Sequence, residues 1–189
     1  MIAPASGFER SAFEAGLAVI AGRYRAEYGA GIFERQRYLA GSDARRLTEL
    51  QAVLADPAIR AVFCVRGGYG ATRLLARLAR HAPPGAAKPL VGFSDITALH
   101  LWLQAHGRIS FHGPVLTQLP RLASSAHTRL FELLESARPA APLAGTAAYV
   151  GGTAEGAFAR RQPVGADTAA RHPVHAAARW GDPAARGSG

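Results

Sequence analysis

The stretch "KPLVGFSDITALHLWLQAHG" (residues 88–107) joins a short apolar run directly to a helix-forming run. Residues 88–93 predict a strand, and residues 95–107 predict a helix closed by Gly107. The same order occurs upstream, where the strand-like "IRAVFCV" (residues 59–65) is followed by "RGGYG" and a helical run. Strands that alternate with helices over short connections predict βαβ units and a parallel sheet, and therefore an α/β fold.

Apolar periodicity and cap residues predict the remaining elements. Ser42 is expected to cap a helix and Asp43 to lie in its first turn, while Ser124 or Ser125 is expected to cap the last helix. The other elements, in chain order, are a strand end at residues 1–6, a helix around residues 13–21, a loop at residues 33–41, a helix at residues 42–55, a helix at residues 71–79, a strand and turn at residues 108–114 and a helix at residues 124–136.

The composition indicates a soluble globular protein. The chain has 189 residues, 49% of them hydrophobic, and a single cysteine, Cys64, which excludes an intrachain disulfide framework. Neither a signal peptide nor a membrane-spanning apolar run is apparent. We therefore expect a cytoplasmic protein without a membrane partner.

The net charge of +9 suggests nucleic-acid binding, but the distribution of charge does not favour it. Only Lys88 among the 22 basic residues is a lysine, and the arginines are scattered rather than gathered into a stripe. The seven histidines show no metal-ligand spacing, and "RGGYG" matches neither a dinucleotide-binding nor a Walker motif. We expect no nucleic-acid partner, no metal and no cofactor.

Three loops, "RGGYG" (residues 66–70), "FSD" (residues 93–95) and "FHGP" (residues 111–114), follow predicted strands. Ligands of parallel sheets bind beyond the carboxyl ends of the strands, so these loops are expected to share one crevice. Ser94 is either a nucleophile at a strand-to-helix turn or an ordinary helix cap. His112 is either a base or a structural residue, and His100 is expected to point away from the Ser94 hydroxyl.

Several stretches together resemble the LD-carboxypeptidase family of serine peptidases, which also contains the microcin C self-immunity peptidases. They are "RYLAGSDARRLTEL", "DPAIRAVFCVRGGYGATRLL", "KPLVGFSDITALHLWL", "FHGPVLTQL" and "GTAEG", and they extend the resemblance over residues 1–156. The resemblance implies an N-terminal α/β sandwich with a parallel sheet, similar to class I glutamine amidotransferases and to flavodoxin-like layers. It also implies a homodimer, because members of the family are commonly homodimeric.

The resemblance implies roles for single residues. Ser94 corresponds to the nucleophile, and the backbone N–H groups of Asp95 and Gly68 correspond to the oxyanion hole. Gly67, Tyr69 and His112 are the remaining candidates for substrate binding. The implied reaction is hydrolysis of the amide bond before the terminal D-alanine of murein tetrapeptide during cell-wall recycling. A microcin-type amide hydrolase and a non-catalytic module that binds peptides or carboxylates are the alternatives.

The family's catalytic glutamate and histidine come from a C-terminal domain that is not recognisable in this chain. Residues 157–189 lack a sustained apolar period and are expected to be disordered. With suitable codons, Arg160 to His175 read one base later gives "GGNLSVLTRLLGTPF", which is similar to the family. We therefore expect a frameshift just after Gly156, an out-of-frame tail, and a truncated chain with no significant carboxypeptidase activity, because a serine hydroxyl is a poor nucleophile without a base.

Overall fold

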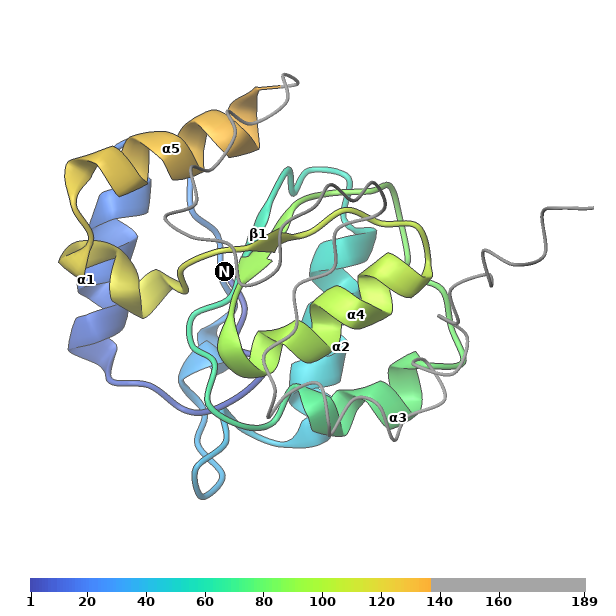
Figure 1. Ribbon diagram of the computed structural model, residues 1–189. Coiled ribbons are helices and arrows are strands. Elements are labelled where there is room, and N and C mark those ends of the chain that lie inside the picture. Colours follow the sequence, from blue (N-terminus) through green and yellow to red (C-terminus); the bar gives the residue numbers. More distant parts are fainter. Residues whose placement is uncertain (137–189) are drawn as a thin grey trace, which may run out of the picture. The chain divides into compact units, whose positions relative to one another are not determined.

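The computed structural model describes residues 1–136 (Figure 1). Met1–Arg121 belong to one compact unit, and Leu122 begins a second, which contains helix α5 (Ser124–Glu135). The predicted domain boundary at Gly156 and the predicted disorder of residues 157–189 lie outside the described residues. Within the described residues no helix is long and apolar enough to cross a membrane.

A parallel sheet lies at the centre of the first unit. Its strands are β1 (Val62–Phe63), β2 (Leu90–Gly92) and β3 (Phe111–His112), in the order β1-β2-β3 and all parallel. Ile2 forms a further parallel bridge with Cys64, so the predicted strand end at the start of the chain lies along the free edge of β1. The predicted α/β class with a parallel sheet is confirmed, and the flavodoxin-like assignment stays a prediction.

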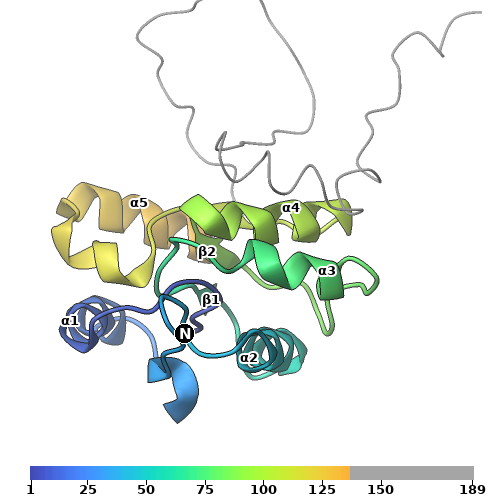
Figure 2. The ribbon, with the colours of Figure 1, turned by 90° about the horizontal axis from the view of Figure 1, so that it is seen from below.

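Helices α2, α3 and α4 lie together on one side of the strands, and α1 lies on the other side (Figures 1 and 2). Leucines of α2 and α3 and Trp102 of α4 share one buried cluster with the strand residues. On the other side, Gly16 of α1 contacts the turn η4 so closely that a Cβ would lie 2.3 Å from the Leu116 carbonyl oxygen. The element bounds in this unit are α1 (Arg10–Ala21), η1 (Ala30–Phe33), α2 (Asp43–Ala55), η2 (Thr72–Leu74), α3 (Leu75–Leu78), η3 (Ser94–Ile96), α4 (Thr97–Ala105) and η4 (Leu116–Arg121).

Most predicted helix ends are confirmed. Ser42 Oγ accepts the Arg45 N–H at 3.1 Å, and Gly107 has φ +68, as a residue that closes a helix should. The cap predicted at Ser124 or Ser125 is wrong, because Ala123 holds the cap position and Ser124 is already the first helical residue. The predicted loop at residues 33–41 contains a tight turn, in which Gln36 and Leu39 exchange two backbone hydrogen bonds.

Candidate active site

Ser94 stands at a sharp turn between β2 and the helical segment that follows it. Its backbone has φ +64, a left-handed conformation that is uncommon for a residue with a side chain. The helix-cap interpretation of Ser94 is wrong. Phe93 and Ile96 hold the cap positions of η3 and α4, and neither cap is closed by a side-chain hydrogen bond. The turn instead presents a half-buried hydroxyl at the carboxyl end of β2.

The glycine loop "RGGYG" lies directly against this turn. A Cβ at Gly67 would lie 3.0 Å from the Ser94 Cβ and 3.4 Å from the Ser94 Oγ, so only glycine fits without displacing the serine. Gly68 follows with φ +93. Within residues 1–136, neither the Gly68 N–H nor the Asp95 N–H donates a hydrogen bond. Both N–H groups therefore lack an acceptor within this part of the chain.

The side chain of Asp95 fixes the far end of the glycine loop. Its carboxylate accepts the Ala71 N–H at 2.6 Å and the Thr72 hydroxyl at 2.8 Å. Burial raises the pKa of this carboxyl, and the two donors partly offset the effect. The carboxylate thus binds the start of η2, 23 and 24 residues upstream in the chain.

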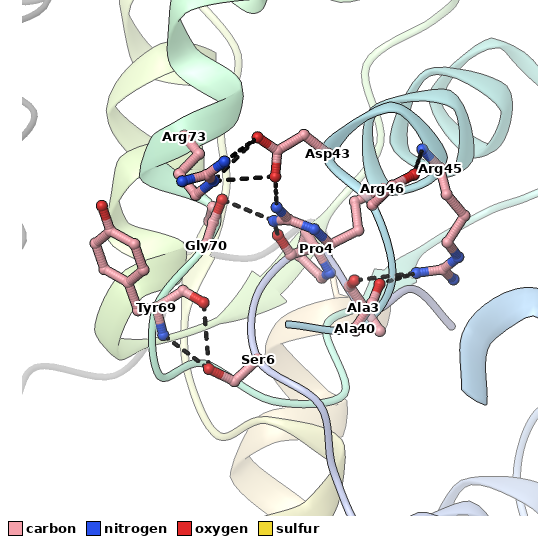
Figure 3. Close-up of polar contacts among 12 residues, drawn as sticks. Ala3, Pro4, Ser6, Ala40, Asp43, Arg45, Arg46, Tyr69, Gly70 and Arg73 are labelled. Atoms are coloured by element: carbon pink, nitrogen blue, oxygen red, sulfur yellow. Dashed lines mark hydrogen bonds and ion pairs between the residues drawn. The ribbon is translucent and has the colours of Figure 1, made fainter. Parts of the chain in front are cut away.

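Ser6 fixes the near end of the loop. Its hydroxyl accepts the Tyr69 N–H at 3.0 Å and lies 3.2 Å from the Tyr69 carbonyl oxygen, to which it donates (Figure 3). The Ser6 N–H donates to the Gly67 carbonyl at 3.2 Å. Gly68 is in such close contact that a Cβ there would lie 2.3 Å from Ser6 Oγ. These contacts set the direction of the peptide planes on both sides of Gly68.

Arg46 is a third support, which the sequence analysis missed. Its side chain is completely buried, and its Nη1 donates to the carbonyl oxygens of Pro4 at 2.5 Å and Gly70 at 2.7 Å (Figure 3). Its Nη2 is paired with Asp43. The helical spacing could have indicated that Arg46 is buried, because it lies four and eight residues before the buried Leu50 and Leu54 and so shares their face of α2.

The two histidines near the turn differ in role. His100 points away from the Ser94 hydroxyl, as predicted: its ring nitrogens lie 2.8 Å from the Gly92 carbonyl and 2.8 Å from the Ser110 hydroxyl. Burial lowers the pKa of His100 to about 4, so its ring is neutral and structural. The His112 ring packs against Phe93, next to Ser94, with centroids 6.3 Å apart.

The site combines a half-buried serine hydroxyl with two backbone N–H groups that donate no hydrogen bond within the described residues. Within residues 1–136, no hydrogen bond joins Ser94 Oγ to a histidine or a carboxylate. A serine hydroxyl flanked by backbone donors suits acyl transfer through a tetrahedral oxyanion, provided that a base is brought to it.

The N-terminal domain model of the LD-carboxypeptidases matches residues 1–113. This chain belongs to the LD-carboxypeptidase family. The matched residues include the glycine loop, the Ser94 turn and His112. Family membership confirms the resemblance drawn from the sequence motifs.

Curated relatives of this LD-carboxypeptidase chain are carboxypeptidases. The murein tetrapeptide carboxypeptidase of Pseudomonas aeruginosa is 38% identical over 143 residues, which are 72% of this chain and 45% of the relative. A putative carboxypeptidase of Streptomyces coelicolor is 50% identical over 80 residues, which are 41% of this chain and 26% of the relative. The chain thus spans less than half the length of these relatives.

Solved structures of the family have the same fold. Muramoyltetrapeptide carboxypeptidase from Oxalobacter formigenes is 28% identical, with a TM-score of 0.59, over 71% of this chain and 47% of the other. The MccF-like protein from Streptococcus pneumoniae has a TM-score of 0.64 at 20% identity, over 73% of this chain and 44% of the other, and shows likeness of fold alone.

Proposed function

We propose that this chain is the nucleophile-bearing half of a serine-type LD-carboxypeptidase that removes the terminal D-alanine from murein tetrapeptide. The observation that supports the proposal is Ser94, held at positive φ in contact with Gly67 of the glycine loop. The N–H groups of Gly68 and Asp95 have no acceptor within residues 1–136 and are the donors that we assign to the oxyanion. The family's name and the names of its curated relatives support the choice of reaction and substrate.

The chemistry follows from the positions of these groups. Ser94 Oγ attacks the carbonyl carbon before D-alanine and gives its proton to a base, and the carbonyl oxygen becomes an oxyanion. The N–H groups of Gly68 and Asp95 donate to that oxygen. The intermediate collapses, D-alanine leaves with a proton on its amine, and water then hydrolyses the acyl-serine ester.

The base comes from outside residues 1–136, as a glutamate and a histidine of the C-terminal domain in the family. A frameshift after Gly156 removes both from the 189-residue chain. Loss of the base typically lowers kcat by about 10⁴-fold or more, so the chain as written releases D-alanine at least that much more slowly than the protein read in the corrected frame.

Two proteins test the proposal: the 189-residue chain and the product of the gene with the reading frame corrected after codon 156. D-alanine release from purified murein tetrapeptide is measured for both. We expect release only from the frame-corrected protein, and its loss in Ser94→Ala. Ser11→Ala, at an exposed position on α1, is the matched control and should keep full activity.

Each part of the proposal has its own contrary result. Rapid release by the 189-residue chain would refute the need for the missing residues. Full activity of frame-corrected Ser94→Ala would refute the nucleophile. Resequencing codons 150–190 decides the frameshift itself, since an uninterrupted frame in clean reads contradicts it.

A further inference from the structure

An open pocket of about 390 Å³ lies near the glycine loop. It is lined by the turn at residues 36–39, by Ser42 and Asp43 at the start of α2, and by Arg73, which follows the loop. None of these residues has a role in the bond cleavage proposed for Ser94. The lining is mostly polar and charged, so the pocket suits a charged or hydrogen-bonding group.

Arg37 occupies an unusual place in this lining. It is the first central residue of the two-residue turn between Gln36 and Leu39, and its φ is +57. Glycine is favoured at that place because it adopts positive φ without steric cost. The Arg37 side chain is exposed and forms no ion pair or hydrogen bond within residues 1–136. The turn thus holds a free guanidinium at the pocket in a strained backbone conformation.

The pocket is positively charged. Asp43 is its one acidic lining residue, and hydrogen bonding and ion pairing with Arg73 and Arg46 lower the pKa of that carboxyl, so it stays ionised. Arg73 and the buried Arg46 pair with this carboxylate, whereas Arg37, the other arginine of the lining, has no ion pair within residues 1–136. The remaining positive charge is available to an anion, and guanidinium groups bind carboxylates with particular strength because their paired N–H donors match the two oxygens.

Side-chain and backbone contacts connect the pocket to the glycine loop. The Tyr69 ring, in the glycine loop, lies 6.0 Å from the Tyr38 ring between centroids, and both rings are about half exposed. Ser6 bonds the backbone of Tyr69, and the neighbouring Gly7 N–H donates to the Tyr38 carbonyl at 2.9 Å. Both tyrosines are therefore anchored to the same segment of backbone.

We propose that this pocket binds a carboxylate of the peptide substrate remote from the scissile bond, through Arg37, beside the Asp43–Arg73 ion pair. Tyr38 and Tyr69 pack against the peptide between the pocket and the Ser94 turn. The inference rests on the proposed function for the identity of the substrate. Murein tetrapeptide suits the pocket because its D-glutamate carries a free α-carboxylate when it is linked through its γ-carboxyl.

Chemical-shift mapping tests the location. The 189-residue chain with Ser94→Ala, which prevents turnover, is labelled with ¹⁵N and titrated with murein tetrapeptide. We expect the amide signals of residues 36–39 and Arg73 to move together with those of residues 67–70 and Asp95. Movement only at residues 67–70 and Asp95 would overturn the subsite and leave the proposed function standing. Shift changes only at the pocket residues would support the subsite and contradict the proposed function. The absence of any shift change would contradict both.

Affinity tests the chemistry. In the same Ser94→Ala chain, Arg37→Gly should weaken tetrapeptide binding about tenfold, as expected for loss of one hydrogen-bonded charge pair. Its urea midpoint should equal or exceed that of the parent, since glycine relaxes the turn. Arg37→Lys should keep part of the affinity, and Arg60→Gly, an equal charge change at the opposite end of β1, should keep all of it.

A tetrapeptide whose D-glutamate α-carboxyl is amidated completes a double-mutant cycle, in which both peptides are compared on the parent chain and on Arg37→Gly. It should bind the parent chain about tenfold more weakly than the free acid and should be insensitive to Arg37→Gly. Equal affinity of both peptides for the parent, or equal affinity of the parent and Arg37→Gly for the free acid, would overturn the proposal.

Discussion

Protonation of His100 should destabilise the fold between pH 6.5 and 4. The ring lies 2.8 Å from the carbonyl of Gly92, the last residue of β2 before the Ser94 turn, and burial lowers its pKa from the usual 6.5 to about 4. The unfolded chain takes up this proton below pH 6.5, and the folded chain only near pH 4. The contribution of neutral His100 to the unfolding free energy is thus fully present above pH 6.5. It is lost as the pH falls from 6.5 to about 4.

The size of the effect follows from the same two values. One pH unit of difference in pKa corresponds to about 1.4 kcal/mol, so the full window corresponds to about 3 kcal/mol. About 2 kcal/mol of it should disappear between pH 7 and pH 4.5. Burial raises the pKa of Glu49 and of Asp95, so the protonation of these two carboxyls stabilises the fold as the pH falls and opposes the effect of His100. The lowered pKa of Asp43 changes the stability only below about pH 4.

The test compares urea unfolding of the parent chain and His100→Gln at pH 7, 6, 5 and 4.5. Glutamine keeps a donor and an acceptor near Gly92 and Ser110 but does not titrate. The gap in unfolding free energy between the two proteins should narrow by about 2 kcal/mol from pH 7 to pH 4.5. His81→Gln, at an exposed position, is the control and should run parallel to the parent. A gap that stays constant with pH would refute the argument.

Three substitutions test the supports of the glycine loop by urea unfolding. Arg46→Met should lower the unfolding free energy by about 3 kcal/mol, because the buried Pro4 carbonyl oxygen loses its Arg46 donor and the Gly70 carbonyl oxygen keeps only the Arg73 N–H. A smaller loss than for a surface arginine would contradict the role. Asp95→Ala should cost about 2 kcal/mol by leaving a buried N–H without its acceptor, and Asp95→Asn should cost less. Gly68→Ala should cost about 2 kcal/mol, since its Cβ would lie 2.3 Å from Ser6 Oγ, and adding Ser6→Gly should recover part of the loss.

Features set by neighbouring residues were predictable from the sequence. The Ser42 cap needs only the helix that follows it, and the left-handed Gly107 needs only the helix that precedes it. The parallel sheet followed from the alternation of apolar runs with helices. The cap predicted at Ser124 or Ser125 was wrong because two serines and an alanine in a row leave the first helical residue undetermined, and the helix begins at Ser124.

Features set by distant residues were not predictable in the same way. The sequence left Ser94 open between nucleophile and cap, because its φ depends on β2 and on the close contact with Gly67. The role of the Asp95 carboxylate was not predicted, because it depends on Ala71, which is 24 residues away in the chain. Arg46 escaped notice because a charged side chain is rarely fully buried unless it is paired, and its partners come from two separate loops.

Backbone strain links the two proposals about this chain. Within residues 1–136, Arg37 and Ser94 are the non-glycine residues at positive φ. Glycine would relax either turn, so each side chain is kept at a cost of about 1 kcal/mol or more in local conformational energy. Such strain persists only where the surroundings fix the backbone: two hydrogen bonds close the turn of Arg37, and Gly67 packs against Ser94. One strained residue presents the proposed nucleophile and the other a free guanidinium, and the Tyr38 and Tyr69 rings contact each other on the loops that carry them. This placement is what a peptide site needs if it is to hold its substrate at two fixed points, one at the bond to be cut and one at a distant charge.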